Sequence, residues 1–423
     1  MAKPAIELLV ESLGARGDGI ARHGEDRVFL PLTLPGDRVR ARLERAGSEG
    51  IAGSVVEVMQ PGPSRAEPAC RHFGDCGGCA LQHLDAEFYA EWKTELLRAA
   101  LARKGLSDGP MEPLVPGRPG IRRRADFTAL RRREGVTLGF NAKMTHRVVD
   151  LEECPILLPE ITALIPALRT LCADMLAIAG KAELVVAATD GGLDLLVVDA
   201  GGLALKRREA LVAFADEHDL ARVSHRHPRQ GGPELVVERR PVTMRFGDVA
   251  VPIPPGAFLQ ATAGGEAALT AVVTEAARDA VTIADLYCGC GTFTFPLAAA
   301  GAAVHAVDGL DWQIRVVERA ARAAILNRVT AEVRDLSKRA LQPAQLAAYD
   351  AVVFDPPRAG AAVQAQALAE SNVQTVVGIS CNPASFARDA RILVDGGFHI
   401  ERIVPVDQFL WSPHLELAAV FRR

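Results

Sequence analysis

Long apolar runs, an excess of positive charge and a regular pattern of paired cysteines are all missing from this 423-residue chain. No run is long enough to cross a bilayer, and Met1-Ala2-Lys3-Pro4 leads into a short mixed strand instead of the apolar core of a secretory signal. We therefore expect a soluble cytoplasmic protein without a membrane partner. The net charge of −4 does not indicate a nucleic-acid binder, although a whole-chain sum can hide a local basic patch.

The length and the apolar content favour several packed domains. A chain of this length usually folds as two or three domains, and 49% hydrophobic residues suffice for sizeable cores. The eight cysteines are unevenly spaced, and four of them fit a pattern that is typical of metal sites. Such spacing favours reduced thiols that bind a metal or a cluster, and it argues against disulfides.

Residues 1–60 are predicted to form a small β-barrel. Turns rich in Gly, Asp and Pro separate short apolar or alternating segments at 6–10, 27–30, 38–43 and 53–58. Strands at this spacing are typical of a five-stranded OB-like barrel, a fold that often binds nucleic acid. The stretch GDGIARHGEDRVFLPLTLPGDRV at 17–39 resembles the TRAM domain of RNA-modifying enzymes, and a generic small barrel is the alternative.

Three cysteines, Cys70, Cys76 and Cys79, follow a proline-rich linker at 61–64. Their C-x5-C-x2-C spacing cannot complete a four-thiolate site, so the fourth ligand must come from elsewhere. Cys154 is the best candidate, because a Cys-Pro pair often closes such sites in ferredoxins. The intervening glycines let the backbone wrap tightly around a cluster. We expect a [4Fe–4S] cluster, and Zn²⁺ is the alternative because four thiolates also suit it.

Residues 85–104 are predicted to form a helix that packs on the C-terminal domain. Its apolar face holds Leu96, Leu97, Ala100 and Leu101, and the polar residues outside that face are Lys93, Glu95 and Arg98.

A strongly basic hairpin follows this helix. Between positions 118 and 147, nine arginines and lysines face only two acidic residues, and alternating segments at 126–130 and 136–140 predict two strands. A charge run is usually a solvated face, but this one also suits contacts to phosphates. Residues 160–240 add helices and strands without a motif, and 226–233 is predicted to be an exposed turn.

From about residue 250 the sequence alternates regularly between strand and helix. One strand ends in Asp285-Leu286-Tyr287-Cys288-Gly289-Cys290-Gly291, and a helix begins soon after it. Glycines at this place let the backbone approach a ligand at the helix N-terminus. Asp308 ends the next strand, where its carboxylate can accept hydrogen bonds from ribose hydroxyls. These two features fit S-adenosylmethionine and NAD equally well.

Two later motifs favour the methyl donor. Asp355-Pro356-Pro357-Arg358 ends a fourth strand, at the place where methyltransferases hold the reacting base. Ser380-Cys381-Asn382-Pro383 ends the strand at 376–380, and Pro383 forces a turn there. A thiol at the carboxyl end of a strand, before a helix N-terminus, is in a setting that lowers a cysteine pKa. For this position alone, a half-buried structural cysteine is the alternative.

The motifs together resemble those of the RNA 5-methyluridine methyltransferases, most closely the 23S ribosomal RNA uracil-5 methyltransferases that carry a TRAM domain and an iron–sulfur cluster. The likeness covers nearly the whole chain and rests on C-x5-C-G-G-C-x2-Q-H-L at 70–84, F-L-Q at 258–260, D-L-Y-C-G-C-G-T-F-T at 285–294, D-P-P-R-A-G at 355–360, S-C-N-P at 380–383 and H-L-E at 414–416. It implies that Cys381 is the nucleophile, that Glu416 is the base, and that Asp355 and Arg358 shape the pocket. The implied donor contacts are Gln260, Tyr287, Thr292, Asp308, Asp335 and Asp355, and the implied cluster ligands are Cys70, Cys76, Cys79 and Cys154.

The two catalytic candidates suit the chemistry of uracil. Uracil C5 is too poor a nucleophile to take a methyl group directly, and addition of a thiolate at C6 makes C5 enolate-like. A base must then remove the C5 proton so that the thiol can leave. Glu416 lies between His414 and the apolar segment 417–421, so it can be partly desolvated and basic. Because C6 is reached only when the base leaves its stack, we expect a single-stranded RNA loop as substrate.

We therefore predict an α/β protein with three domains. These are an OB-like barrel of the TRAM type at 1–60, an α+β RNA-binding domain with the iron–sulfur cluster at 61–249, and a Rossmann-like class I methyltransferase domain at 250–423. The expected activity is S-adenosylmethionine-dependent methylation of a uridine in 23S ribosomal RNA by a monomer. The alternatives are the same reaction on transfer RNA, cytosine-5 methylation, and a catalytically idle RNA-binding protein.

Overall fold

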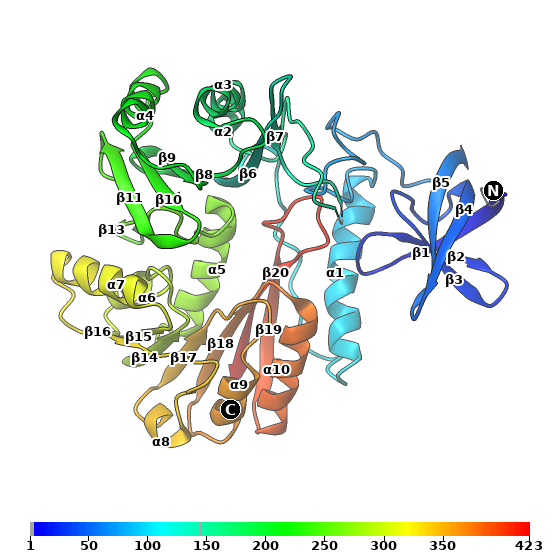
Figure 1. The fold of residues 1–423 in the computed structure, drawn as a ribbon. Coiled ribbons are helices and arrows are strands. Elements are labelled where there is room, and N and C mark those ends of the chain that lie inside the picture. The colour runs from blue at the N-terminus through cyan, green and yellow to red at the C-terminus, as the bar shows by residue number, and fades with distance from the viewer. Residues whose placement is uncertain (1–3, 144) are drawn as a thin grey trace.

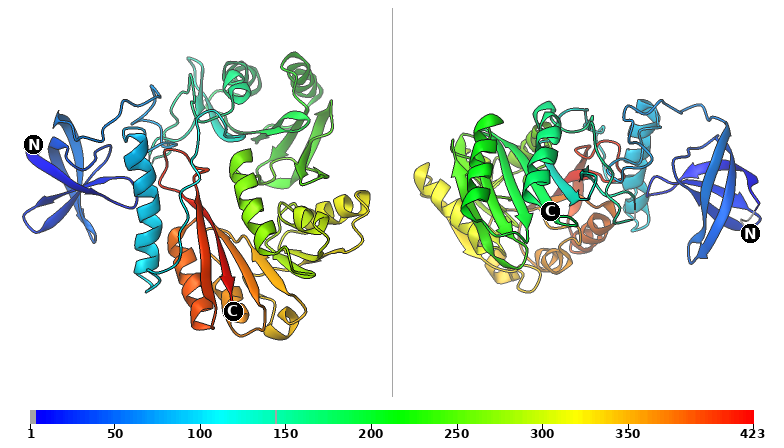
Figure 2. Two further views of the ribbon diagram at one scale, coloured as in Figure 1. Left: turned by 180° about the vertical axis from the view of Figure 1, so that it is seen from behind. Right: turned by 45° about the horizontal axis from the view of Figure 1, so that its top comes forward.

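The computed structural model describes residues 4–143 and 145–423, which form a closed barrel and sheets of six, two and seven strands. The barrel lies at one end of the molecule, and the long helix α1 (Ala86–Ala102) stands between it and the seven-stranded sheet (Figure 1). The six-stranded sheet lies above the seven-stranded one in Figure 1, and the view from behind shows the same arrangement (Figure 2).

The N-terminal barrel confirms the predicted five-stranded fold. Its strands are β1 (Ile6–Leu13), β2 (Gly19–His23), β3 (Asp26–Leu30), β4 (Arg38–Gly47) and β5 (Gly50–Gln60). Strand β1 pairs with both β2 and β4, and β3 pairs with β5, so the sheet closes on itself without a free edge. Alternate apolar residues such as Val10, Val28 and Leu30 point inward and fill the barrel.

A six-stranded sheet forms the centre of the chain, in the order β11-β10-β9-β8-β6-β7. Its strands are β6 (Arg124–Arg131), β7 (Val136–Gly139), β8 (Lys181–Thr189), β9 (Gly192–Asp199), β10 (Arg222–His227) and β11 (Gln230–Glu238). Helices α2 (Pro159–Ala163), α3 (Ile165–Met175) and α4 (Leu205–Glu217) share one apolar core with the sheet. The prediction of an exposed turn at 226–233 is confirmed in part: residues 228–229 form the exposed turn between β10 and β11, and the rest of the stretch continues these two strands.

The C-terminal half forms the seven-stranded sheet, in the order β16-β15-β14-β17-β18-β20-β19. Its strands are β14 (Thr282–Leu286), β15 (Ala303–Asp308), β16 (Val329–Val333), β17 (Ala351–Phe354), β18 (Thr375–Ser380), β19 (His399–Val406) and β20 (Glu416–Arg422). Neighbouring strands from β16 to β18 are parallel, and β20 runs antiparallel to both β18 and β19. The predicted α/β architecture is confirmed. A hairpin of β12 (Thr243–Phe246) and β13 (Val249–Pro252) precedes this sheet.

Helices cover this sheet because its buried strands need apolar partners on both faces. They are α5 (Ala263–Ala276), α6 (Thr294–Ala299), α7 (Asp311–Ala323), α8 (Pro343–Leu346), α9 (Ala362–Ala369) and α10 (Pro383–Asp395). Helix α1 joins them from the distant N-terminal half, since its Leu97, Ala100 and Leu101 are buried in the same core as Phe386 and Ala387 of α10.

A second, smaller core joins four distant parts of the chain and is called the junction core below. Its buried residues are Leu34 of the barrel, Leu81 and Leu84 of the cysteine-rich segment, and Tyr89 and Trp92 of α1, with Leu410 and Trp411 packed against them. The barrel, the cysteine-rich segment and α1 therefore all meet the connection between β19 and β20. Among the described residues, no helix is long and apolar enough to cross a membrane.

Candidate active site

The predicted motifs meet at one edge of the seven-stranded sheet. Asp308 ends β15, Asp355 follows β17 and Cys381 follows β18, so all three lie at the carboxyl ends of parallel strands. Glu416 starts the antiparallel strand β20, and Leu417 pairs with Ser380 across the β18–β20 ladder. Because β20 runs opposite to the parallel strands, its first residue, Glu416, lies at the same edge. It is next to Cys381, which follows Ser380.

Cys381 lies half-buried in the turn between β18 and α10. Asn382 caps α10, because its Oδ1 accepts from the backbone N of Ala384 at 3.1 Å, and its Nδ2 donates to the carbonyl of Arg358 at 3.0 Å. Burial, and then the carboxylates of Glu416 and Asp355, raise the pKa of the Cys381 thiol to about 11, and Arg358 opposes them. The expected lowered pKa is therefore wrong for the protein alone, because burial and two anions outweigh the helix terminus.

Glu416 is buried within a chain of amide side chains. Gln408 Nε2 donates to Glu416 Oε2 at 3.0 Å and to Gln260 Oε1 at 2.7 Å, and Gln260 Nε2 donates to Asp355 Oδ2 at 3.2 Å. Burial and the nearby Asp355 raise the pKa of Glu416, and burial raises the pKa of Asp355. The expected desolvation of Glu416 is confirmed, since the residue is only 4% exposed.

The glycine-rich turn after β14 has the backbone that its sequence demands. Gly289 and Gly291 adopt φ values of +57° and +96°, and a Cβ at Gly291 would lie 2.4 Å from the ring of Phe295. Tyr287 has a left-handed φ of +60°, which is uncommon for an aromatic residue and typical of functional sites. The backbone N of Gly289 donates to Asp308 Oδ2 at 3.1 Å, so Asp308 holds this turn against the end of β15.

The other two predicted donor residues lie near the same edge in different surroundings. Asp335 follows β16, and hydrogen bonds from the Ser337 side chain, then Lys338, hold the pKa of its carboxyl below the usual value. Thr292 lines a separate hollow of about 400 Å³ between the β12–β13 turn and α5. Thr292 is thus the one predicted donor residue among those that line this hollow.

Two cavities open at the catalytic edge. One of about 200 Å³ is lined by Cys381, Arg358 and His414, together with Arg103 just after α1 and Arg16 from the β1–β2 turn of the barrel. The other, of about 440 Å³, lies between the cysteine-rich segment, β6 and the β19–β20 connection. Residues of the barrel, of α1 and of the loops at the edge of the seven-stranded sheet therefore all line the cavity at Cys381.

The four predicted cluster ligands are brought together from two segments. Each of Cys70, Cys76, Cys79 and Cys154 is close enough to affect the ionisation of the others. Burial is the main cause that raises the pKa of Cys79 to about 12 and that of Cys154 to about 11. In the described ranges 4–143 and 145–423, no three His, Cys, Asp or Glu side chains are grouped so as to hold a metal ion.

Ion pairs neutralise part of the predicted basic patch in the fold. Arg123 is buried and pairs with Glu266 at 2.5 Å, and Lys143 pairs with Asp18 of the barrel at 2.7 Å. Arg124 and Arg147 are also paired, and Arg122 is mostly buried. Within the described part of the chain, the predicted patch keeps five basic residues that form no ion pair: Arg118, Arg122, Arg131, Arg132 and Arg133.

Two residues near the site, Gln408 and Lys93, carried no recognisable signal of their role in the sequence. Gln408 lies in no motif, yet its amide joins Glu416 to Gln260. Lys93 was expected outside the apolar face of its helix, and this is wrong, because its side chain is 0% exposed and pairs with Asp407 at 2.9 Å.

Comparison with known proteins assigns the family. Residues 249–423 match the family described as tRNA (Uracil-5-)-methyltransferase. The 23S rRNA (uracil(1939)-C(5))-methyltransferase RlmD of Chromohalobacter salexigens is 35% identical over 98% of this chain and 89% of its own length. The chain belongs to the RNA (uracil-5-)-methyltransferase family. An uncharacterized RNA methyltransferase of Brucella suis biovar 1 (strain 1330) is 43% identical over 99% of this chain and 98% of its own length.

A solved structure supports the fold over the whole length of this family member. The Pyrococcus abyssi tRNA (uracil-54, C5)-methyltransferase in complex with S-adenosyl-L-homocysteine matches with a TM-score of 0.75. The match covers 98% of this chain and 100% of that one at 22% sequence identity. The barrel, the six-stranded sheet and the seven-stranded sheet therefore occur together in both proteins.

Proposed function

We propose that this protein transfers a methyl group from S-adenosylmethionine to C5 of a uridine in 23S ribosomal RNA, through a covalent bond between Cys381 and C6. The observation that carries the proposal is the meeting of Cys381, Glu416 and Asp355 at one sheet edge, beside a cavity of about 200 Å³. The RlmD relative, which matches nearly the whole chain, supports ribosomal RNA. Transfer RNA is the alternative, supported by the family description of the C-terminal half.

The chemistry divides between the two catalytic candidates. The Cys381 thiolate adds to C6 of the uracil, and the electron pair of the C5–C6 double bond moves to C5. Bound S-adenosylmethionine supplies an electrophilic methyl group and a positive charge near the thiol. Once C5 carries the methyl group, Glu416 takes the C5 proton, the double bond returns and the bond between Cys381 and C6 breaks. The raised pKa of Glu416 makes it a stronger base for this step than an exposed carboxylate.

Six residues are proposed to hold the donor: Gln260, Tyr287, Thr292, Asp308, Asp335 and Asp355. The positive φ values at Tyr287, Gly289 and Gly291 support close approach of the backbone to this ligand. Asp308 and Asp335 end or follow neighbouring strands, where carboxylates can accept from ribose hydroxyls or an amino group. The support for Thr292 is weaker, because it lines a different hollow.

We propose a [4Fe–4S] cluster at Cys70, Cys76, Cys79 and Cys154. Two observations support it: the four thiols lie near one another, and the buried Gln82 side chain beside Cys79 lowers the pKa of that thiol against the effect of burial. Four thiolates suit a [4Fe–4S] cluster and also a single Zn²⁺ with bonds of about 2.3 Å, so zinc is the alternative that metal analysis distinguishes. Such a cluster would stabilise thiolates that burial disfavours.

The three parts of the chain are proposed as domains at 1–60, 61–249 and 250–423, of which the first is a TRAM-type RNA-binding barrel. The unpaired arginines at 131–133 lie on the turn between β6 and β7 and suit contacts to RNA phosphates. A monomer in the cytoplasm is the expectation that goes with this proposal.

The experiment offers unmodified 23S ribosomal RNA and transfer RNA, separately, to anaerobically purified protein with S-adenosylmethionine. Mass spectrometry then identifies the modified nucleoside. We expect 5-methyluridine in ribosomal RNA alone. 5-Methyluridine in transfer RNA alone would keep the chemistry and replace the substrate, and no product from either RNA would favour an idle RNA-binding protein.

A further inference from the structure

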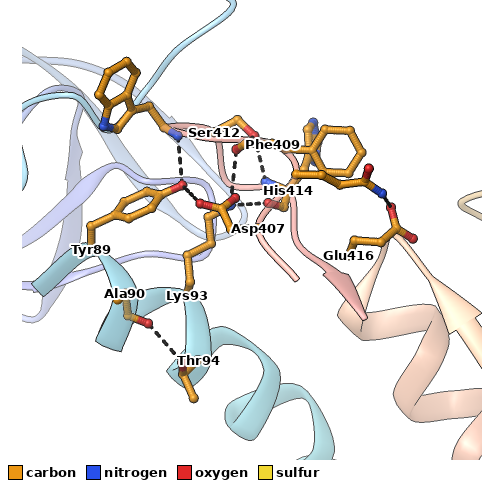
Figure 3. Close-up of polar contacts among 11 residues, drawn as sticks. Tyr89, Ala90, Lys93, Thr94, Asp407, Phe409, Ser412, His414 and Glu416 are labelled. Atoms are coloured by element: carbon orange, nitrogen blue, oxygen red, sulfur yellow. Dashed lines mark hydrogen bonds and ion pairs between the residues drawn. The ribbon is translucent and has the colours of Figure 1, made fainter. Parts of the chain in front are cut away.

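The connection between β19 and β20, residues 407–415, is held at both ends by one buried side chain of α1. Lys93 Nζ lies 2.9 Å from Asp407 Oδ1, and the two side chains are 0% and 1% exposed. The same ammonium donates to the carbonyl of Phe409 at 3.3 Å and to the carbonyl of His414 (Figure 3). Lys93 therefore joins the first residue of the connection to a residue two positions before Glu416.

Tyr89, one turn earlier on α1, holds the middle of the connection. Its hydroxyl donates to Asp407 Oδ2 at 2.8 Å and accepts from the backbone N of Trp411 at 2.8 Å (Figure 3). The carbonyl of Trp411 in turn accepts from the backbone N–H groups of Ala80 and Leu81, at 2.8 and 3.1 Å. Trp411 has a φ of +57°, a conformation that bulky residues adopt only where the surroundings enforce it. These hydrogen bonds, within the junction core, hold Trp411 in this conformation.

The held connection leads directly to the proposed base. Asp407 is followed by Gln408, whose Nε2 donates to Glu416 Oε2 at 3.0 Å. Val406 at the end of β19 pairs with Glu416 at the start of β20, so a shift of either end of the connection moves Glu416. A buried ion pair contributes little net stability over apolar side chains of similar size, whereas it does specify one arrangement of the chain. This ion pair is thus placed to set geometry at the edge of the active site.

We propose that Lys93, together with Tyr89 and Asp407, is a positioning residue that holds the 407–415 connection so that Glu416 faces the C5 proton of the methylated adduct. The inference rests on the proposed function of Glu416 as the base. The contacts of Lys93, Tyr89 and Asp407 with the connection are called the clamp below. The clamp acts on the last chemical step, because Cys381 and the donor residues belong to other strand ends. Loss of the clamp therefore slows elimination more than it slows formation of the adduct.

The test compares wild-type protein with Lys93→Met in steady-state methylation of RNA. We expect kcat to fall about 100-fold, as a misplacement of about 1 Å in a reacting group can cause. The KM for RNA should stay within about twofold, and methylated protein–RNA adduct should accumulate on denaturing gels. The double variant Lys93→Met/Asp407→Asn removes the unpaired buried charge and should accumulate adduct in the same way, which covers the case that Lys93→Met folds poorly.

Hydrogen exchange gives a readout that does not depend on the chemistry. Amides in 407–416 should exchange faster in Lys93→Met, while those of β14 and β18 should not change. Arg65→Met is the matched control, because it removes the partner of another buried carboxylate, Asp37 in the barrel, and should leave the elimination step unchanged. The inference would be overturned if Lys93→Met kept the amide exchange of 407–416 and the turnover of the wild-type protein. It would also be overturned if this variant lost covalent adduct and methylated product to the same extent. A wild-type protein that makes no 5-methyluridine would refute the proposed function instead, with exchange still deciding the clamp.

Discussion

Cys381 lies in surroundings that disfavour its reactive form. Burial and the carboxylates of Glu416 and Asp355 raise its thiol pKa to about 11, and Arg358 is the nearby group that opposes them. The thiolate is therefore scarce at neutral pH until positive charge enters the pocket. A cationic methyl donor supplies such charge, so the nucleophile would gain reactivity together with the donor.

Substitution of the two catalytic candidates should stop the reaction at different points. Cys381→Ala should abolish methylation and every covalent RNA adduct, because no other group adds to C6. Glu416→Gln should lower turnover by about 1000-fold or more and accumulate methylated adduct, since addition and methyl transfer precede its step. Denaturing gels with labelled RNA measure both outcomes. Cys172→Ala, a buried cysteine of α3, is the control and should keep activity. Methylation by Cys381→Ala would remove the thiol from the mechanism.

Arg358 should lower the pKa of the Cys381 thiol. Below its pKa of about 11, the thiolate fraction of Cys381 rises about tenfold for each pH unit. Arg358→Met removes the opposing positive charge, so the pKa should rise further and alkylation of the Cys381 peptide by iodoacetamide at pH 8 should slow about tenfold. Arg358→Lys keeps the charge and should slow it less. Mass spectrometry of that peptide over pH 7–10 gives the rates, and superimposed profiles for all three proteins would refute the role.

Elements from distant parts of the chain build the site together. Helix α1 packs its apolar face on α10, which begins just after Cys381, and its Lys93 reaches the connection before Glu416. The β1–β2 turn of the barrel supplies Arg16 to the cavity at Cys381. The barrel must therefore be folded and docked for the entrance to the nucleophile to be complete.

A pH-sensitive ion pair between Asp37 and Arg65 links the barrel to the segment that follows it. Burial alone would raise the pKa of Asp37, but Arg65 and the backbone N–H groups of Gly62 and Leu34 hold it below its ordinary value of 3.8. The stability that this carboxylate contributes is present above pH 3.8 and is lost as pH falls through the lower folded pKa. Hydrogen exchange of β1–β5 at pH 5 and pH 3 should show that loss.

Removal of the Asp37 carboxylate should reproduce the effect at neutral pH. Asp37→Ala should destabilise the barrel by about 3 kcal/mol, the low end for a broken buried pair, because Arg65 keeps some exposure. Glu57→Gln removes the partner of Arg40 in an exposed pair of the same barrel and should cost under about 1 kcal/mol. Equal effects of the two substitutions would contradict this assignment.

At the level of the whole molecule, the cysteine-rich segment lies between the barrel and the active site. Cys79 is followed by Ala80 and Leu81, whose backbone N–H groups donate to Trp411 in the β19–β20 connection. Cys154 comes from the central part of the chain and joins the other three thiols. Ligation at the four cysteines would therefore hold two segments together beside the connection that leads to Glu416.

The proposed cluster can be tested by metal analysis of the full chain. Protein purified anaerobically should contain roughly four irons and four labile sulfides per chain. Cys154→Ser should lose most of that iron, because the fourth thiolate is missing, while Cys172→Ser should keep it. Stoichiometric zinc without sulfide would replace the cluster by the alternative metal, and iron unaffected by Cys154→Ser would require another fourth ligand.

The sequence by itself determined the local chemistry of this protein. The glycine turn after β14, the Asp-Pro-Pro turn after β17 and the Ser-Cys-Asn-Pro turn after β18 were predictable because each is a short motif whose backbone and side chains act together. The parallel strands then had to bring these turns to one edge. The barrel was predictable for a similar reason, since alternation and turn residues are local signals.

Only the tertiary structure decided which charges are buried and which residues support the site. Lys93 is a polar residue on a helix by sequence, and its partner Asp407 lies 314 positions later in the chain. Arg123 and Lys143 belong to a basic run by sequence, yet Glu266 and Asp18 neutralise them from distant parts of the chain. Gln408 became part of the site through a connection that has no motif. Partners so distant are selected by packing and desolvation, which no local pattern records.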